Sequence, residues 1–277
     1  MPANDTQGLI RTRRIIYLLV AAAIIVPYVI QMPIPSFHAQ EEAHKVYDRV
    51  ESLPAGSRVL IAMEFDPNCE AELRPMAEGI LRHCFARKLV PILVTTNYIA
   101  PALISDICQK IAKETGTVSG KDWVFLGYRP GMANVVITMG ESIQRTFETD
   151  NFSQTTRDMP ALAGVNSLKD VSLITVISLG DTVNMWIQYG SDRLKVPLVA
   201  GVTAVMAPDL YPYLNTGQVK GILAGLRGAA DYELLLHRSD DAAKGMQVQS
   251  VAHGLLIALI IGANVRFLFR RAQGKEA

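Results

Sequence analysis

The sequence lacks a complete catalytic or nucleotide-binding motif. No G-x-G-x-x-G follows its first apolar run, so the fingerprint of a dinucleotide site is missing, and no G-x-S-x-G marks a nucleophilic serine. The stretch Gly116–Lys121 resembles a phosphate loop only superficially. It has one residue too few between its glycines, and Asp122 follows it where Ser or Thr is required. These absences lead us to lean against an enzyme, and they imply no particular cofactor.

Cysteine is also scarce, with three residues in 277. Cys69, Cys84 and Cys108 have neither the spacing of metal ligands nor the even number of a disulfide framework. Cys84 and Cys108 fall on apolar helical faces, so we expect buried thiols. Cys69 begins a predicted helix, where an exposed thiol would have a lowered pKa.

Charge of one sign is not in excess, because the formal net charge is +1. Its distribution is uneven. When the seven basic and two acidic residues of the two tails are set aside, the rest of the chain has 20 Lys and Arg against 24 Asp and Glu. A mildly acidic central region argues against nucleic-acid binding, which requires a basic surface.

Two long apolar runs lie near the ends of the chain, at Ile15–Met32 and Val248–Phe269. A membrane-spanning helix needs about 20 mostly apolar residues, and both runs approach this length. The first is too long for the apolar part of a cleaved signal peptide, which has roughly 7–15 residues. We therefore predict two transmembrane helices in contact with membrane lipid.

Basic residues on the outer side of each run predict the topology. Arg11, Arg13 and Arg14 precede the first run, and Arg270 and Arg271 follow the second. Because basic tails remain in the cytoplasm, we expect both termini to be cytoplasmic and the central domain extracytoplasmic. The predicted organisation is a tail at 1–14, spans at 15–32 and 248–269, a linker with an amphipathic helix at 33–57, a domain at 58–247 and a tail at 270–277.

The central region alternates short apolar runs with helical patterns. Runs that are continuously apolar are typical of strands buried on both faces of a parallel sheet. This order predicts a doubly wound α/β domain with a mainly parallel sheet, Rossmann-like or flavodoxin-like. The predicted strands are Arg58–Phe65, Leu89–Thr95, Asp122–Tyr128, Val171–Ser178 and Val196–Thr203, and the predicted helices are His38–Leu53, Glu70–Lys88, Pro101–Glu114, Thr182–Arg193 and Thr216–Leu236.

Polar residues follow the predicted strands, where ligands bind in open α/β sheets. Asp66 and Asp181 could hold a divalent cation through oxygen ligands, and Arg129 could bind an anionic group. The same aspartates also fit ordinary turns and helix caps. The candidate ligand-binding residues are Asp66, Asn68, Thr96, Arg129, Asp181 and Thr182, and the candidate metal ligands are Asp66 and Asp181.

Two glycine-rich stretches and an apolar loop point to an interface. Tyr211 and Tyr213 lie in a loop between prolines, and Gly221 and Gly225 lie on the predicted final helix. That helix packs either on another subunit or on the domain's own sheet. In the second span, Gly254, Ala258 and Gly262 share one face, as in closely packed membrane helices.

Gly131–Asp170 is predicted to be a long insertion after the third strand, of the kind that forms functional loops or interaction surfaces. Without catalytic machinery, we favour an extracytoplasmic domain that mediates assembly, as a homo-oligomer or in a membrane complex. The alternative is a membrane-tethered enzyme or a protein that binds a small ligand or anion at the strand ends.

Overall fold

The computed structural model describes residues 3–30 and 38–273. It divides into an α/β domain, Phe37–Ala242, and a second unit of two terminal helices. The predicted end of the first span at Met32, the start of the predicted linker and the end of the C-terminal tail lie outside the described residues.

Within residues 38–273, the strands form one six-stranded parallel sheet in the order β3-β2-β1-β4-β5-β6. The predicted doubly wound α/β fold is therefore confirmed. The order reverses between β1 and β4, which is the topological switch point of a Rossmann-like sheet. The strands are β1 Arg58–Glu64, β2 Val90–Thr95, β3 Val124–Tyr128, β4 Leu173–Ser178, β5 Leu198–Val202 and β6 Ile222–Ala224.

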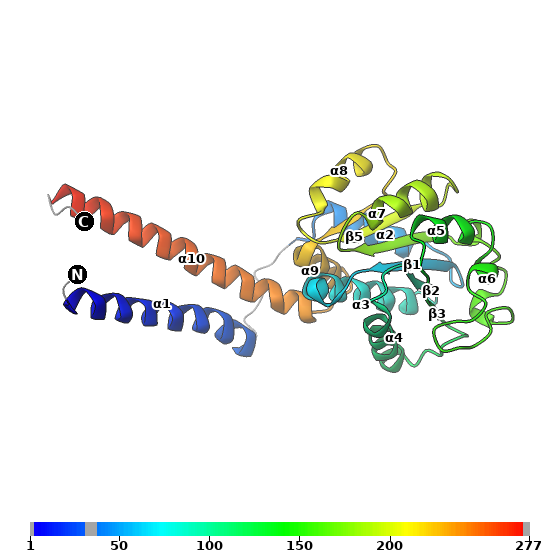
Figure 1. Ribbon diagram of the computed structural model, residues 1–277, viewed down its shortest axis with the longest axis horizontal. Helices are drawn as coiled ribbons and strands as arrows, with labels where there is room; N and C mark the ends of the chain where they lie inside the picture. Colours follow the sequence, from blue (N-terminus) through cyan, green and yellow to red (C-terminus); the bar gives the residue numbers. More distant parts are fainter. Residues whose placement is uncertain (1–2, 31–37, 274–277) are drawn as a thin grey trace. The chain divides into compact units, whose positions relative to one another are not determined.

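Helices cover both faces of this sheet (Figure 1). On β1, Leu60 and Ala62 join the core beneath one set of helices, and Val59 and Ile61 join the core beneath the other, because alternate residues of a strand point to opposite faces. The first set is α5 Ala133–Met139, α6 Ile143–Thr146, α7 Thr182–Met185 and α8 Ala207–Asn215; the second is α2 Glu41–Glu51, α3 Glu70–Ala86, α4 Pro101–Thr115 and α9 Gly225–Leu235.

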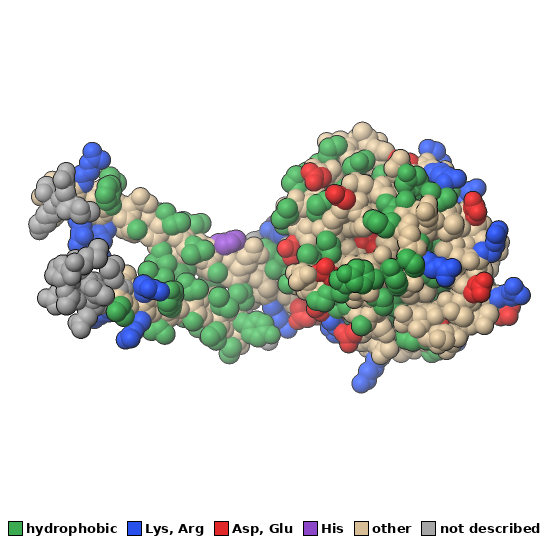
Figure 2. Space-filling model, viewed as in Figure 1, with side chains coloured by type: hydrophobic (Ala, Val, Ile, Leu, Met, Phe, Trp, Pro, Cys, Tyr) green, Lys and Arg blue, Asp and Glu red, His purple; other side chains and the backbone are tan. Residues whose placement is uncertain are grey.

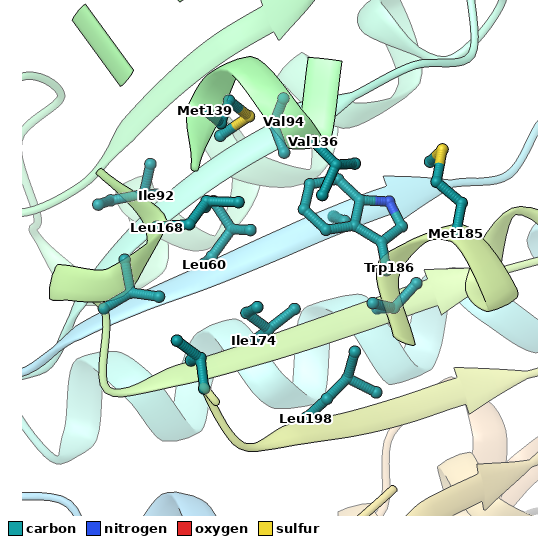
Figure 3. Packing of buried hydrophobic residues seen from close by; sticks show 14 of the residues in the cluster. Leu60, Ile92, Val94, Val136, Met139, Leu168, Ile174, Met185, Trp186 and Leu198 are labelled. Carbon is teal, nitrogen blue, oxygen red and sulfur yellow. The ribbon is translucent and has the colours of Figure 1, made fainter. Parts of the chain in front are cut away.

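The chain also contains shorter helical turns. The segment after α7 is a π-helix, η4, where the sequence predicted one continuous helix to Arg193. It brings Trp186 into the core, where the indole lies beside Val136 and over the strands that carry Leu60 and Ile174 (Figure 3). The short elements are η1 Pro67–Cys69, η2 Pro160–Leu162, η3 Leu168–Asp170 and η4 Trp186–Asp192.

The predicted final helix, Thr216–Leu236, is wrong. The structure has a turn, the short strand β6 and then α9. A Cβ atom at Gly221 would lie 2.7 Å from the backbone nitrogen of Val46 in α2, so this glycine permits close packing within the chain. Gly225 has a φ of +58° and begins α9. The glycine-lined helical face on which an interface was predicted therefore does not exist.

Two predicted loops are also wrong. The apolar stretch with Tyr211 and Tyr213 is helix α8, with Pro208 in its first turn, where a missing N–H costs nothing. The predicted insertion Gly131–Asp170 contains α5 and α6 and contributes many side chains to the core. This segment connects β3 to β4 across one face of the sheet. Its buried side chains pack on that face, so it is not an exposed loop.

Two buried carboxylates on α9 hold the segments where the chain enters and leaves the domain. Asp231 accepts a hydrogen bond from the backbone nitrogen of Gln40, at the start of α2. Glu233 accepts from the backbone nitrogens of Asp240 and Ala242, at the start of the last helix. Both acidic residues are about 2% exposed. Helix α9 thus fixes both connections of the domain.

The terminal unit contains α1 Ala3–Ile30 and α10 Asp241–Ala272. Both are long and apolar enough to span a membrane. Their apolar side chains are largely unburied, with Ile260 61% and Leu18 70% exposed. Figure 2 shows apolar side chains along most of both helices. A buried core helix has the opposite pattern, and α10 lies far from the N-terminus, where signal sequences occur.

Candidate functional site

The carboxyl end of β1 meets the carboxyl end of β4 at the switch point, where Glu64 pairs with Ser178. Parallel strands that are buried on both faces end here in polar residues, so their side chains gather at one edge of the sheet. This is the edge at which the sequence predicted a ligand site.

Glu64 is the most buried carboxylate at this edge, with 2% of its surface exposed. Its oxygens accept hydrogen bonds from the backbone nitrogen of Thr96 at 3.1 Å, from Thr96 Oγ1 at 2.9 Å and from Trp186 Nε1 at 3.2 Å. Burial raises the pKa of Glu64, and these donors oppose the rise because they stabilise the ionised carboxylate. The network joins the ends of β1 and β2 to the helix after β4.

The predicted residues Asp66 and Asn68 form a local cap. Asp66 Oδ1 accepts a hydrogen bond from the backbone nitrogen of Asn68 at 2.8 Å, at the start of η1. Thr182 Oγ1 lies 2.7 Å from Ser178 Oγ. Asp181 begins α7 without a side-chain cap. Asp66 therefore follows the ordinary capping pattern that the sequence allowed, and Asp181 does not.

The candidate metal ligands Asp66 and Asp181 can be compared with the other metal-ligating side chains that the structure describes. In 3–30 and 38–273, no three His, Cys, Asp or Glu side chains gather as a metal site would require. Asp66 and Asp181 therefore belong to no such group, and a cation bound by either one would need hydroxyl, carbonyl or water oxygens as further ligands.

A pocket of about 290 Å³ lies beyond the carboxyl end of β3. Arg129, directly after the strand, lines one part, and Arg145 of α6 lines another. Asn134, Thr138 and Ser142 from the α5–α6 segment supply amide and hydroxyl groups. The crossover that was predicted to be a loop therefore contributes most of this site.

The pocket contains more positive than negative charge, with Arg129 and Arg145 against Glu141. Neither arginine forms an ion pair with any residue that the structure describes. Guanidinium groups without a carboxylate partner are suited to an anion, because their planar donors match carboxylate and phosphate oxygens. The arrangement can therefore bind a small anion through charge and hydrogen bonds.

The structure places the predicted ligand-binding residues in separate local arrangements and not in one site. Thr96 joins the Glu64 network, and Arg129 joins the pocket. Sequence reasoning missed Glu64 as a site residue, although it is the last residue of β1 and so lies at the strand end where ligands bind. It also missed Arg145, since the segment around it has no regular apolar spacing that would have placed it.

The predicted interface residues differ in exposure. Tyr211 is 42% exposed, whereas Tyr213 packs against the core. On α10, a Cβ atom added at Gly254 or Gly262 would meet no atom within 4 Å, so this face of the helix is open within the chain. Ala258 lies on α10 between them and is exposed.

The cysteines are free, and two are buried as expected. Burial raises the pKa of Cys84 to about 12 and also raises the pKa of Cys108. The lowered pKa expected for an exposed thiol at Cys69 does not apply, because Cys69 is partly buried. Partial burial, followed by the charges of Asp66 and Glu72, raises the pKa of this thiol. A raised pKa disfavours the thiolate, which is the reactive form of cysteine, at all three positions.

Comparison with known proteins adds no functional assignment. No protein-family model matches the sequence, and no curated protein matches it significantly.

Proposed function

We propose that this chain is a membrane-anchored protein whose α/β domain binds a small carboxylate in the pocket beyond β3. The observation that carries the proposal is the pair Arg129 and Arg145, which line one pocket without an ion-pair partner among the described residues. With Glu141 included, the pocket has a surplus of one positive charge, which a single carboxylate would balance.

The anchor in this proposal is the pair of terminal helices. Their exposed apolar side chains would be lipid-facing, and the basic residues beyond them favour cytoplasmic termini with the domain on the opposite side. This topology would present the pocket to ligands outside the cytoplasm.

Calorimetric titration of the full-length protein in nanodiscs tests the ligand proposal. The probes are a series of mono- and dicarboxylates, with inorganic phosphate for comparison. Replacing Arg129 or Arg145 with Gln should weaken carboxylate binding by about tenfold or more, because each arginine provides a charge-assisted hydrogen bond. Arg193→Gln is the matched control, since Arg193 is exposed and lies outside the pocket. Equal affinities in all variants would refute the proposal.

Assembly is a second candidate, and it is favoured by the open face of α10. Gly254 and Gly262 have no neighbours that a side chain would displace within the chain. Close packing of such small residues stabilises helix pairs in membranes. Gly254→Leu and Gly262→Leu should therefore reduce cross-linking between copies in detergent or lipid. Ala263→Leu is a control for added bulk, because Ala263 is exposed and lies two and a half turns from Gly254, on the opposite side of α10.

A further inference from the structure

A second pocket lies at the opposite edge of the sheet, where β5 and β6 begin. Its volume is about 350 Å³, at the low end of the range of about 300–1,000 Å³ for small-molecule sites. Arg49 near the end of α2, Asp192 and Lys195 around the end of η4, and Gln218 and Lys220 before β6 all line it. Three separate segments of the domain thus bring polar groups together.

The charges of this pocket are unbalanced. Arg49, Lys195 and Lys220 supply three positive charges, and Asp192 supplies one negative charge. None of the three basic side chains forms an ion pair within residues 3–30 and 38–273. Because like charges repel, their convergence on one pocket favours a bound anion.

The single carboxylate of this pocket already has a partner. Asp192 Oδ2 accepts a hydrogen bond from Gln218 Nε2, and Gln218 Oε1 in turn accepts from Thr216 Oγ1 at 2.9 Å. Lys220 Nζ donates to the carbonyl of Gly217 at 2.6 Å, which neutralises none of its charge. The surplus of two positive charges therefore remains.

Arg49 and Lys195 reach the pocket from different segments of the chain. The side chain of Arg49 is partly exposed and only its Nε atom is buried, so its terminal nitrogens are the groups that it offers to the pocket. Lys195 has a φ of +62°, a region that L-residues seldom occupy, and its backbone nitrogen donates to the carbonyl of Ser191 at 2.7 Å. This left-handed conformation commonly ends a helix, and it places Lys195 shortly after η4 at the rim of the pocket.

We propose that this pocket binds the terminal phosphate of a phosphate monoester. A phosphate monoester has a charge of about −1.5 to −2 at neutral pH, which matches the surplus of two positive charges. The planar guanidinium of Arg49 suits two phosphate oxygens, and Lys195 and Lys220 supply point charges. The site is independent of the carboxylate pocket, because the two lie at opposite ends of the parallel strands.

The test measures binding of inorganic phosphate by the full-length protein in phosphatidylcholine nanodiscs. Lys195→Gln and Lys220→Gln should each weaken binding by about tenfold. Both lysines are exposed, so thermal unfolding should be unchanged. Lys113→Gln, an exposed lysine on α4, is the control for lost charge. Arg129→Gln separates this site from the other pocket, and it should leave phosphate binding intact.

A second arm distinguishes a soluble phosphate from a lipid headgroup. Nanodiscs that contain phosphatidic acid would block inorganic phosphate binding if the headgroup reaches the pocket. They would leave the binding unchanged if the natural ligand is soluble. Both results support a phosphate site, and they differ only in its source.

Two results would overturn the proposal. One is undetectable phosphate binding at millimolar concentration in phosphatidylcholine nanodiscs. The other is phosphate affinity in the Lys195→Gln, Lys220→Gln double variant equal to that of the unmodified protein.

Discussion

The domain and the terminal helices use the same apolar residue types in opposite ways. In the domain, Phe65 and Trp186 are fully buried between helices and sheet. In α10, Ile260 and Leu268 are 61% and 60% exposed. Burying such a side chain contributes roughly 1.5–3 kcal/mol. The domain obtains this stabilisation within the chain, whereas the described chain leaves the apolar side chains of α1 and α10 largely exposed.

The largest expected change in the free energy of unfolding is at Trp186, because this large side chain is fully buried within the domain. Trp186→Ala should lower the free energy of unfolding by about 3–5 kcal/mol, because it leaves a cavity and removes a donor from Glu64. Denaturant unfolding measures the change. Tyr98→Ala is the control, since Tyr98 is 73% exposed and should change the value by less than about 0.5 kcal/mol. Similar losses in both variants would contradict the packing of Trp186 in the core.

A charge introduced into α10 tests whether the exposed apolar side chains of this helix lie in a membrane. Ile257 lies near the middle of α10 and is 57% exposed. Ile257→Lys should make the free energy of membrane insertion of α10 less favourable by about 2.5–3.5 kcal/mol. Val118→Lys is the matched control, because Val118 is 55% exposed on the domain. In a chain that begins at residue 38, so that α10 is the remaining candidate anchor, the fraction of protein that resists alkaline extraction from membranes should fall only for Ile257→Lys. Equal retention of both variants would argue against a span at α10.

Glu64→Ala should destabilise the domain by about 1–3 kcal/mol, because Thr96 and Trp186 would retain buried donors without an acceptor. Denaturant unfolding measures this loss.

The contribution of Glu64 to stability should also depend on pH. Burial raises the pKa of Glu64 in the folded state, so its proton stabilises the fold fully below the unfolded pKa of about 4.3. That stabilisation is lost as pH rises through the folded pKa.

Urea titrations over this acidic range, with Glu64→Gln as the reference that cannot ionise, measure the effect. The unmodified protein should lose stability relative to Glu64→Gln as pH rises. A parallel pH dependence in the two proteins would show that the pKa of Glu64 is not raised by folding.

The smallest expected effect concerns His83, which lies between Tyr232 and Glu51. Burial lowers the pKa of His83, and the hydrogen bond to Glu51 opposes this without overcoming it. The neutral ring therefore stabilises the fold above the unfolded pKa of about 6.5, and this contribution is lost as pH falls through the folded pKa. His83→Gln should remove that part of the pH dependence, as measured by thermal unfolding. If the stability of His83→Gln changed more steeply with pH than that of the unmodified protein, the lowered pKa of His83 would be contradicted.

Much of the fold was predictable because its strands are buried on both faces. The five predicted strands begin and end within two residues of β1 to β5, since continuous apolar runs mark them. β6 was not predictable in this way. Its three residues lie between Gly221 and Gly225, whose role is close packing against distant parts of the chain.

The candidate sites were predictable only in part. Arg129 follows a strand, so the strand-end rule found it. Arg145 and Arg49 reach their pockets through tertiary packing of α6 and α2, which no local spacing encodes. Glu64 is the last residue of a buried strand, and its sequence position does not reveal whether its carboxylate meets solvent or the indole of Trp186.

Labelling of single cysteines in sealed right-side-out vesicles tests the central claim most directly. In a Cys69→Ser background, we would introduce Glu148→Cys on the domain and Ala272→Cys at the end of α10, both at exposed positions. The buried Cys84 and Cys108 should not react. Our account predicts that an impermeant maleimide labels position 148 in intact vesicles and position 272 only after permeabilisation. Labelling of both positions in intact vesicles, or protection of position 148, would contradict it.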